Sequence, residues 1–149
     1  MTDERTLVFL DASVLVAAAR SPNGGSAVAM EVCTGRHFRA VLTTRVLAEA
    51  RVNIAEKFGD TELVRFYRQL ASIEPEMAPE PSEEGVMACV PLTTEKDAHV
   101  LAAALESGAA YLLTLDRRHL LNPLVLSAGL PVRVLTPGEF LQAIVKPSG

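Results

Sequence analysis

Short apolar runs that alternate with helical segments restrict most strongly how this chain can fold. Continuous apolar runs bounded by turn residues are typical of buried strands, and they occur at LVFL (7–10), AVLTT (40–44), AYLLTLD (110–116) and VRVLT (132–136). Strands of this kind, separated by helices, favour a parallel sheet with helices on both faces. We therefore predict an α/β fold in which the carboxyl ends of the strands meet at one edge, where open α/β sheets place their sites.

The segments between these runs have helical periodicity or helix-terminating residues. We predict helices at 13–20, 26–35, 45–59, 60–73, 93–108 and 137–145. The last of these opens with proline, which is favoured at the first helical position. The proline-rich and acidic stretch 74–85 is predicted to be an exposed connection, and VMACVPL (86–92) is predicted to contain a short strand.

Length and composition narrow the class of protein. The 149 residues suit one domain, 1–149, with a single core. A net charge of −4 argues against a protein that binds nucleic acid by phosphate contacts alone. The apolar stretches are shorter than the roughly 20 residues of a membrane span, so no membrane association is expected. Two isolated cysteines, Cys33 and Cys89, favour a reducing, cytoplasmic setting.

Two acidic residues follow apolar strands directly. Asp11 follows the first strand and Asp116 follows the third. Each can be read as a helix or turn cap, because aspartate caps well at a strand-to-helix junction. However, like charges at one sheet edge repel each other unless a cation joins them, so the pair favours a functional site.

Two further acids are candidates for the same site. Asp97 lies in the first turn of the 93–108 helix, where it would also form a capping box with Thr94. Glu95 competes with Asp97 for any functional role. Glu49 lies off the apolar stripe of the 45–59 helix, where a solvated glutamate is the plainer interpretation. If all four carboxylates met at one edge, they would suit hard divalent cations, and metal-assisted phosphodiester hydrolysis is chemistry that such ions support.

Other catalytic arrangements find little support. The sequence has no HExxH, paired CxxC or GxxxxGK[ST] motif, which excludes zinc-protease, zinc-finger and P-loop interpretations. Ser13 has no GxSxG context and no nearby histidine, so we expect its hydroxyl to steady Asp11. The three histidines, His37, His99 and His119, lack ligand spacing and are interpreted as surface or packing residues.

Taken in order, these segments resemble the PIN-domain ribonucleases over nearly the whole chain. "VFLDASVLVAA" is similar to the opening strand and first acid of that family, and "LTTRVLAEARVNIAEKF" to the helix that carries its second acid. "KDAHVLAAALESGAAYLLTLDRRHLL" resembles the family segment in which an acid opens a helix and a strand ends in Thr-x-Asp. "VRVLTPGEFLQAI" is similar to the end of a bacterial, VapC-like branch of toxins.

The resemblance implies a three-layer sandwich and RNA hydrolysis that depends on Mg²⁺ or Mn²⁺. The implied acidic set, catalytic and metal-binding, is Asp11, Glu49, Asp97 and Asp116. Ser13 and Thr114 are implied as polar support, and Arg117 and Arg118 are candidates for holding RNA phosphates, although a solvated turn explains the arginines equally well. Many relatives carry another acid shortly before the position of Asp97, and Thr94 stands near that place, which leaves open whether one or two metals act.

The resemblance also implies a homodimer and, for a toxin, a cognate antitoxin protein. One alternative is a PIN fold that binds partners without turnover. Another is a HAD-like phosphatase with Asp11 as nucleophile. That chemistry requires a second aspartate two residues later, where this chain has Ser13.

Overall fold

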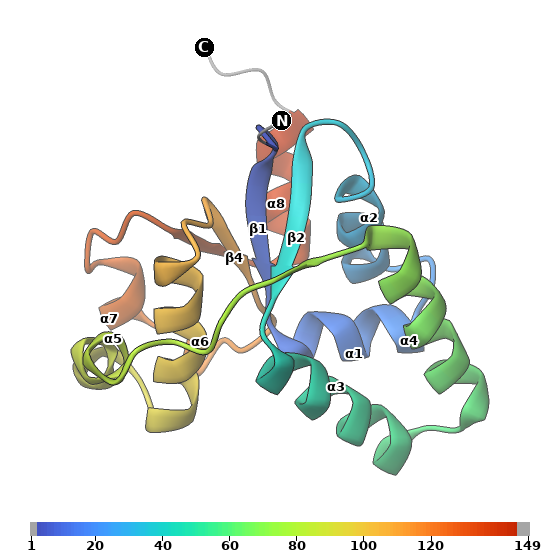
Figure 1. The fold of residues 1–149 in the computed structure, drawn as a ribbon, viewed down its shortest axis with the longest axis horizontal. Helices are drawn as coiled ribbons and strands as arrows, with labels where there is room; N and C mark the ends of the chain where they lie inside the picture. Colours follow the sequence, from blue (N-terminus) through green and yellow to red (C-terminus); the bar gives the residue numbers. More distant parts are fainter. Residues whose placement is uncertain (1–2, 146–149) are drawn as a thin grey trace.

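The computed structural model describes residues 3–145, in which strands and helices alternate (Figure 1). The strands are β1 (Thr6–Leu10), β2 (Phe38–Leu42), β3 (Glu76–Met77), β4 (Tyr111–Leu113) and β5 (Arg133–Leu135). The helices are α1 (Ala12–Arg20), α2 (Gly25–Val32), α3 (Thr44–Lys57), α4 (Asp60–Ile73), α5 (Glu83–Cys89), α6 (Glu95–Glu106), α7 (Pro123–Leu126) and α8 (Pro137–Val145), with a 3-10 turn, η1 (Val90–Leu92), between α5 and α6.

The strands form one parallel sheet in the order β3-β2-β1-β4-β5. The central strand β1 pairs with β2 through Val8 and Ala40, and with β4 through Val8 and Tyr111. Because all strands run the same way, the residues that follow β1, β2 and β4 lie at one edge of the sheet. Asp11, Thr43 and Thr114 occupy these positions.

Helices cover both faces of the sheet, which confirms the predicted three-layer α/β sandwich. Figure 1 shows α5, α6 and α7 on one side and α1 to α4 on the other. Helix α8 packs against α2, on the side of α1 to α4. The strand interiors, such as Phe9 and Leu112, are fully buried, which explains why the strands are continuously apolar rather than alternating. Within residues 3–145, no helix is both long and apolar enough to cross a bilayer.

Two of the predicted helices have the predicted bounds. The segments 60–73 and 137–145 are helical over those residues, as α4 and α8. Thr94 caps α6 as predicted, because its hydroxyl accepts the backbone N–H of Asp97. Helix α2 differs from the prediction: it starts at Gly25 and already ends at Val32.

The prediction of a short strand within 86–92 was wrong. That segment is the end of α5 followed by η1. The buried residues Val86 and Cys89 are three apart, while Met87 between them is 68% exposed, which is helical spacing. Ser82 caps α5 by accepting the Gly85 N–H over 3.0 Å.

The connection predicted at 74–85 is more ordered than expected. It contains the two-residue edge strand β3 and the first turn of α5. Strand β3 is held beside β2 by an ion pair between Arg39 and Glu76 as well as by the backbone. Helix α7 was also not predicted: it is a single turn capped by Asn122, with proline at its first position.

Candidate active site

Asp11 is fixed at the junction between β1 and α1. It is the N-cap of α1, and its Oδ1 accepts the N–H of Ala12 over 2.8 Å. Its Oδ2 accepts the hydroxyl protons of Ser13 over 2.9 Å and of Thr114 over 2.7 Å. The cap and the site interpretations of Asp11 are therefore compatible, because one oxygen caps the helix and the other faces the neighbouring strand end.

Burial sets the electrostatics of Asp11. The residue is only 7% exposed, and desolvation raises the pKa of its carboxyl above the ordinary value. The hydrogen bonds from Thr114, Ser13 and the Ala12 amide act in the opposite direction, while the negative charge of Glu49 raises the pKa further. A buried carboxylate of this kind gains stability from a nearby cation.

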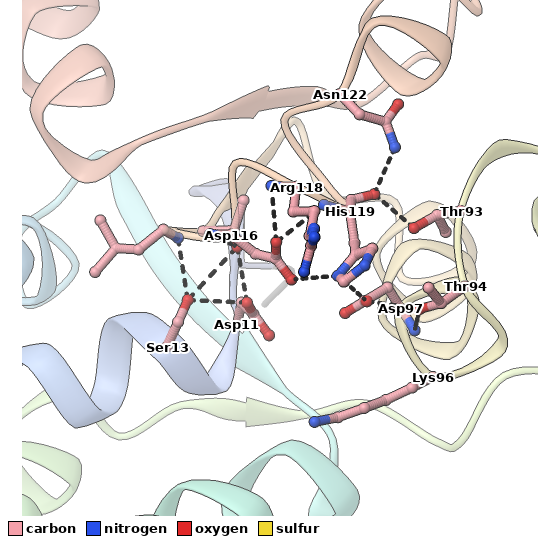
Figure 2. Close-up of polar contacts among 12 residues, drawn as sticks. Asp11, Ser13, Thr93, Thr94, Lys96, Asp97, Asp116, Arg118, His119 and Asn122 are labelled. Carbon is pink, nitrogen blue, oxygen red and sulfur yellow. Dashed lines mark hydrogen bonds and ion pairs between the residues drawn. The ribbon is translucent and has the colours of Figure 1, made fainter.

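The hydroxyls of Thr114 and Ser13 join the ends of β1 and β4. Thr114 is fully buried, and its Oγ1 donates to Asp11 while accepting the N–H of Asp116 over 3.0 Å. Ser13 donates to Asp11 and accepts the N–H of Leu115 over 3.0 Å. These two side chains therefore link Asp11 to the segment that carries Asp116. Figure 2 shows Ser13, Asp11 and Asp116 side by side.

Asp97 and Asp116 come together with a residue that the sequence analysis had set aside. One ligating atom each from Asp97, Asp116 and His119 lies within 4.8 Å of the other two. Nδ1 of His119 is 3.4 Å from Oδ2 of Asp97 and 3.4 Å from Oδ2 of Asp116. The interpretation of His119 as only a surface or packing residue overlooked this proximity. The available signal was its spacing, three residues after Asp116 in a tight turn.

Asp97 and Asp116 are each held by local hydrogen bonds. The hydroxyl of Thr94 donates to Oδ2 of Asp97 over 2.7 Å, which completes the cap of α6. Oδ1 of Asp116 accepts the backbone N–H groups of Arg118 over 3.0 Å and His119 over 2.9 Å. In both cases the capping contacts orient the carboxylate.

Glu49 reaches the same region from α3 but is paired with a lysine. Its carboxylate forms an ion pair with the ammonium of Lys96, from the first turn of α6. This contact raises the pKa of Lys96, so the lysine stays charged. A positive charge in the first turn of a helix opposes the helix dipole. The ammonium of Lys96 is therefore stabilised by its ion pair with Glu49 and not by its position in the helix.

All four candidate acids line one cleft of about 560 Å³. The cleft lining also includes three basic side chains that the sequence analysis did not single out: Arg20, Lys57 and Lys96. Arg20 and Lys57 lie at the carboxyl ends of α1 and α3, away from Asp11, which precedes α1, and eight residues after Glu49, which lies within α3. The cleft thus combines a negative end suited to divalent cations with a positive end suited to anions.

Arg117 and Arg118 lie beside the acids but outside the cleft lining. Both are exposed, and neither is among the described residues that form the cleft walls. The backbone of Arg118, rather than its guanidinium, contacts Asp116.

The carboxylate donors fit a divalent ion such as Mg²⁺ or Mn²⁺. Both ions prefer oxygen ligands, and Mg²⁺ is usually bound by one or two carboxylates together with water. Three of the acids are oriented by neighbouring donors and one is neutralised by a lysine, while the cleft leaves space between them. The residues present therefore suit such an ion.

Several solved structures share the fold of this chain. A crystal structure of PAE2754 from Pyrobaculum aerophilum has a TM-score of 0.62 at 17% identity, covering 98% of this chain and 100% of that one. A crystal structure of VapBC2 from Rickettsia felis, bound to a DNA fragment from the VapBC2 promoter, has a TM-score of 0.59 at 14% identity, covering 87% of this chain and 97% of that one. VapC20 from Mycobacterium tuberculosis, described as a sarcin–ricin loop cleaving toxin, has a TM-score of 0.56 at 13% identity, covering 83% of this chain and 95% of that one.

Sequence comparison identifies the family more directly. No curated protein matches the sequence significantly. The family model PIN_3, described as PIN domain, matches residues 7–118, a span that runs from the second residue of β1 through β4 and includes all four candidate acids. Together with the parallel sheet and the shared fold, this match over most of the chain shows that the protein belongs to the PIN-domain family.

Proposed function

We propose that this protein is a divalent-metal-dependent endoribonuclease that hydrolyses RNA phosphodiester bonds. The observation that carries the proposal is the cleft, which Asp11, Glu49, Asp97 and Asp116 line together although they come from four separate segments. Membership of the PIN-domain family supports the same reaction.

The carboxylates are proposed to hold Mg²⁺ or Mn²⁺. A bound divalent cation would supply Lewis acidity toward the phosphodiester and stabilise negative charge on its oxygens. Asp11, Asp97 and Asp116 are oriented for ligation by the contacts described above, and Glu49 is proposed to join them when Lys96 moves away. Ser13 and Thr114 support Asp11 by donating to its Oδ2, which favours its charged form.

The basic side chains are proposed to position the RNA. Helices α1 and α3 pack against each other, and Figure 1 shows both extending away from the sheet toward the same side. At a rise of about 1.5 Å per residue, the helix α1 places Arg20 about 12 Å from its first residue, Ala12. Phosphates beyond the cleaved bond could therefore contact Arg20 and Lys57, while Arg117 and Arg118 are candidates on the other side of Asp116.

We further propose that the protein is the toxin of a toxin–antitoxin pair. Its fold is shared with VapBC2 and with VapC20, the latter described as a cleaving toxin. A cognate antitoxin, a homodimer, a cytoplasmic location and a single PIN-like domain over residues 1–149 belong to this proposal.

A cleavage assay with matched variants tests the enzyme proposal. Labelled RNAs, single-stranded and hairpin, are incubated with purified protein in Mn²⁺, Mg²⁺ or EDTA. D60N is the control for D11N, because Asp60 is an exposed acid at the start of α4 outside the cleft. We expect metal-dependent cleavage by the wild type and D60N, and none by D11N or in EDTA.

Other outcomes identify the alternatives. RNA binding without cleavage under every condition would indicate a binding module. Hydrolysis of a small phosphoester with covalent phosphate on Asp11 would indicate a phosphatase. For the toxin proposal, expression in a bacterial host is expected to arrest growth with the wild type and D60N but not with D11N, and growth unaffected by an active enzyme would contradict it.

A further inference from the structure

The imidazole of His119 is directed at two of the acids proposed to bind metal. Its Nδ1 lies 3.4 Å from a carboxylate oxygen of Asp97 and 3.4 Å from one of Asp116, and Figure 2 shows the ring between the two carboxylates. The three side chains come from two segments, since Asp97 lies on α6 while Asp116 and His119 follow β4. The arrangement is therefore a product of tertiary packing.

Three backbone contacts hold His119 in this place. Its N–H donates to Oδ1 of Asp116 over 2.9 Å. Its carbonyl oxygen accepts the hydroxyl of Thr93 and the side-chain amide of Asn122, the latter over 2.9 Å. Thr93 immediately precedes Thr94, the cap of α6, so the same loop that orients Asp97 also fixes the backbone of His119. A surface histidine needs no such framework.

The distances from Nδ1 of His119 to the two carboxylates are longer than those of hydrogen bonds. N–H···O hydrogen bonds usually measure 2.7–3.2 Å, so at 3.4 Å the nitrogen closes a hydrogen bond with neither carboxylate. Ligand atoms on adjacent corners of an octahedral site, 2.0–2.1 Å from an ion, are about 3 Å apart. Both nitrogen–oxygen distances are thus close to the separation of neighbouring ligands on one cation, and the three ligating atoms all lie within 4.8 Å of one another.

We propose that His119 is a nitrogen ligand of the divalent ion, together with Asp97 and Asp116. This inference rests on the proposed metal-dependent function and adds a consequence for metal choice. Mn²⁺ also prefers oxygen ligands, but as a transition ion it accepts an imidazole nitrogen more readily than Mg²⁺ does. The mixed set of one nitrogen and several carboxylate oxygens therefore selects Mn²⁺ over Mg²⁺.

Electron spin echo measurements on Mn²⁺-loaded protein test the ligand directly. A nitrogen-bound Mn²⁺ shows modulation from ¹⁴N, which a purely structural histidine would not produce. We expect this modulation in the wild type and in H99Q, and its loss in H119Q. H99Q is the matched control because His99, like Asp97, lies on α6. It is two residues from Asp97 but does not line the acidic cleft.

Calorimetric titration of the same proteins provides the second measurement. Substitutions around metal sites commonly weaken metal binding about 10- to 100-fold, and we expect H119Q to lose at least about 10-fold in Mn²⁺ affinity with a smaller loss for Mg²⁺. The H99Q protein should bind both ions as the wild type does. Circular dichroism establishes whether H119Q is folded. If it is not, the wild-type and H99Q spectra decide the question.

The failures of the two proposals are distinguishable. Wild-type protein that binds Mn²⁺ without ¹⁴N modulation would overturn the role of His119 and leave the metal-dependent nuclease intact. Loss of the modulation in H99Q would show that the nitrogen belongs to another histidine. Wild-type protein that binds no Mn²⁺ at all would overturn both proposals.

Discussion

The hydroxyl of Thr114 donates a 2.7 Å hydrogen bond to Asp11, across 103 positions of the sequence. The same oxygen accepts the N–H of Asp116, so one buried hydroxyl serves the acids that follow two neighbouring strands. Because β1 and β4 are adjacent and parallel, this contact ties the carboxylate positions to the register of the sheet. The geometry of the site is consequently linked to folding stability.

Replacing Thr114 with valine should therefore lower both stability and activity. The substitution keeps the size of the side chain but removes the donor to Asp11 and the acceptor for the Asp116 N–H. A buried polar group left without a partner costs about 1–3 kcal/mol, and chemical denaturation should show a loss of that order in T114V. T114S retains the hydroxyl and is the control; equal stability of T114V and the wild type would contradict the role given to this contact.

Neutralising Asp11 should stabilise the metal-free protein. Since burial raises the pKa of Asp11 in the folded state, the ionised carboxylate favours unfolding at neutral pH. We expect D11N to have a higher Tm than the wild type without metal. The difference should shrink as the pH falls through the raised pKa and vanish below the ordinary aspartate pKa of about 4.

Added Mn²⁺ should reverse that order, because the wild type gains binding free energy that D11N loses. Differential scanning calorimetry at a series of pH values, with Mn²⁺ and with EDTA, measures both effects. A D11N protein that is less stable than the metal-free wild type at neutral pH would show that Asp11 is stabilised by its hydrogen bonds more than it is destabilised by burial.

Removing the charge of Lys96 should strengthen divalent-ion binding. The ammonium neutralises Glu49 and lies on the cleft wall with Asp11 and Asp97, so it competes with a cation for the same carboxylates. We expect the Mn²⁺ Kd of K96M to fall several-fold while RNA cleavage decreases. K57M is the control, because it also removes a lysine from the cleft lining but leaves the ion pair between Lys96 and Glu49 intact. Equal changes in the two variants, measured by calorimetry, would indicate only a general electrostatic effect.

The two cysteines should be unreactive in the folded protein. Cys33 is fully buried, and desolvation raises the pKa of its thiol to about 12. Cys89 is 3% exposed, and burial raises its pKa as well. Because thiolates are the reactive species, Ellman's reagent should label neither thiol at mildly alkaline pH in native protein and both after denaturation. Rapid labelling of one thiol in the native state would show local opening of the surrounding helices.

The sequence by itself determined the order and nature of most elements. The continuous apolar runs predicted β1, β2, β4 and β5, and capping residues placed the start of α6, because these signals depend on neighbours within a few residues. The segment at 86–92 was misassigned because a short apolar run is compatible with either a strand or a helix. In the structure this segment is helical, because a helix buries Val86 and Cys89 on the same face.

Candidate acids could also be named from the sequence, since strand ends and helix first turns are recognisable locally. Only the tertiary structure decided how they are grouped: Asp97 and Asp116 with His119, Glu49 with Lys96, and Arg20 and Lys57 at the far end of the cleft. These groups bring together residues from separate segments of the chain. Local periodicity carries no information about such pairs, because their distances depend on how the helices pack on the sheet.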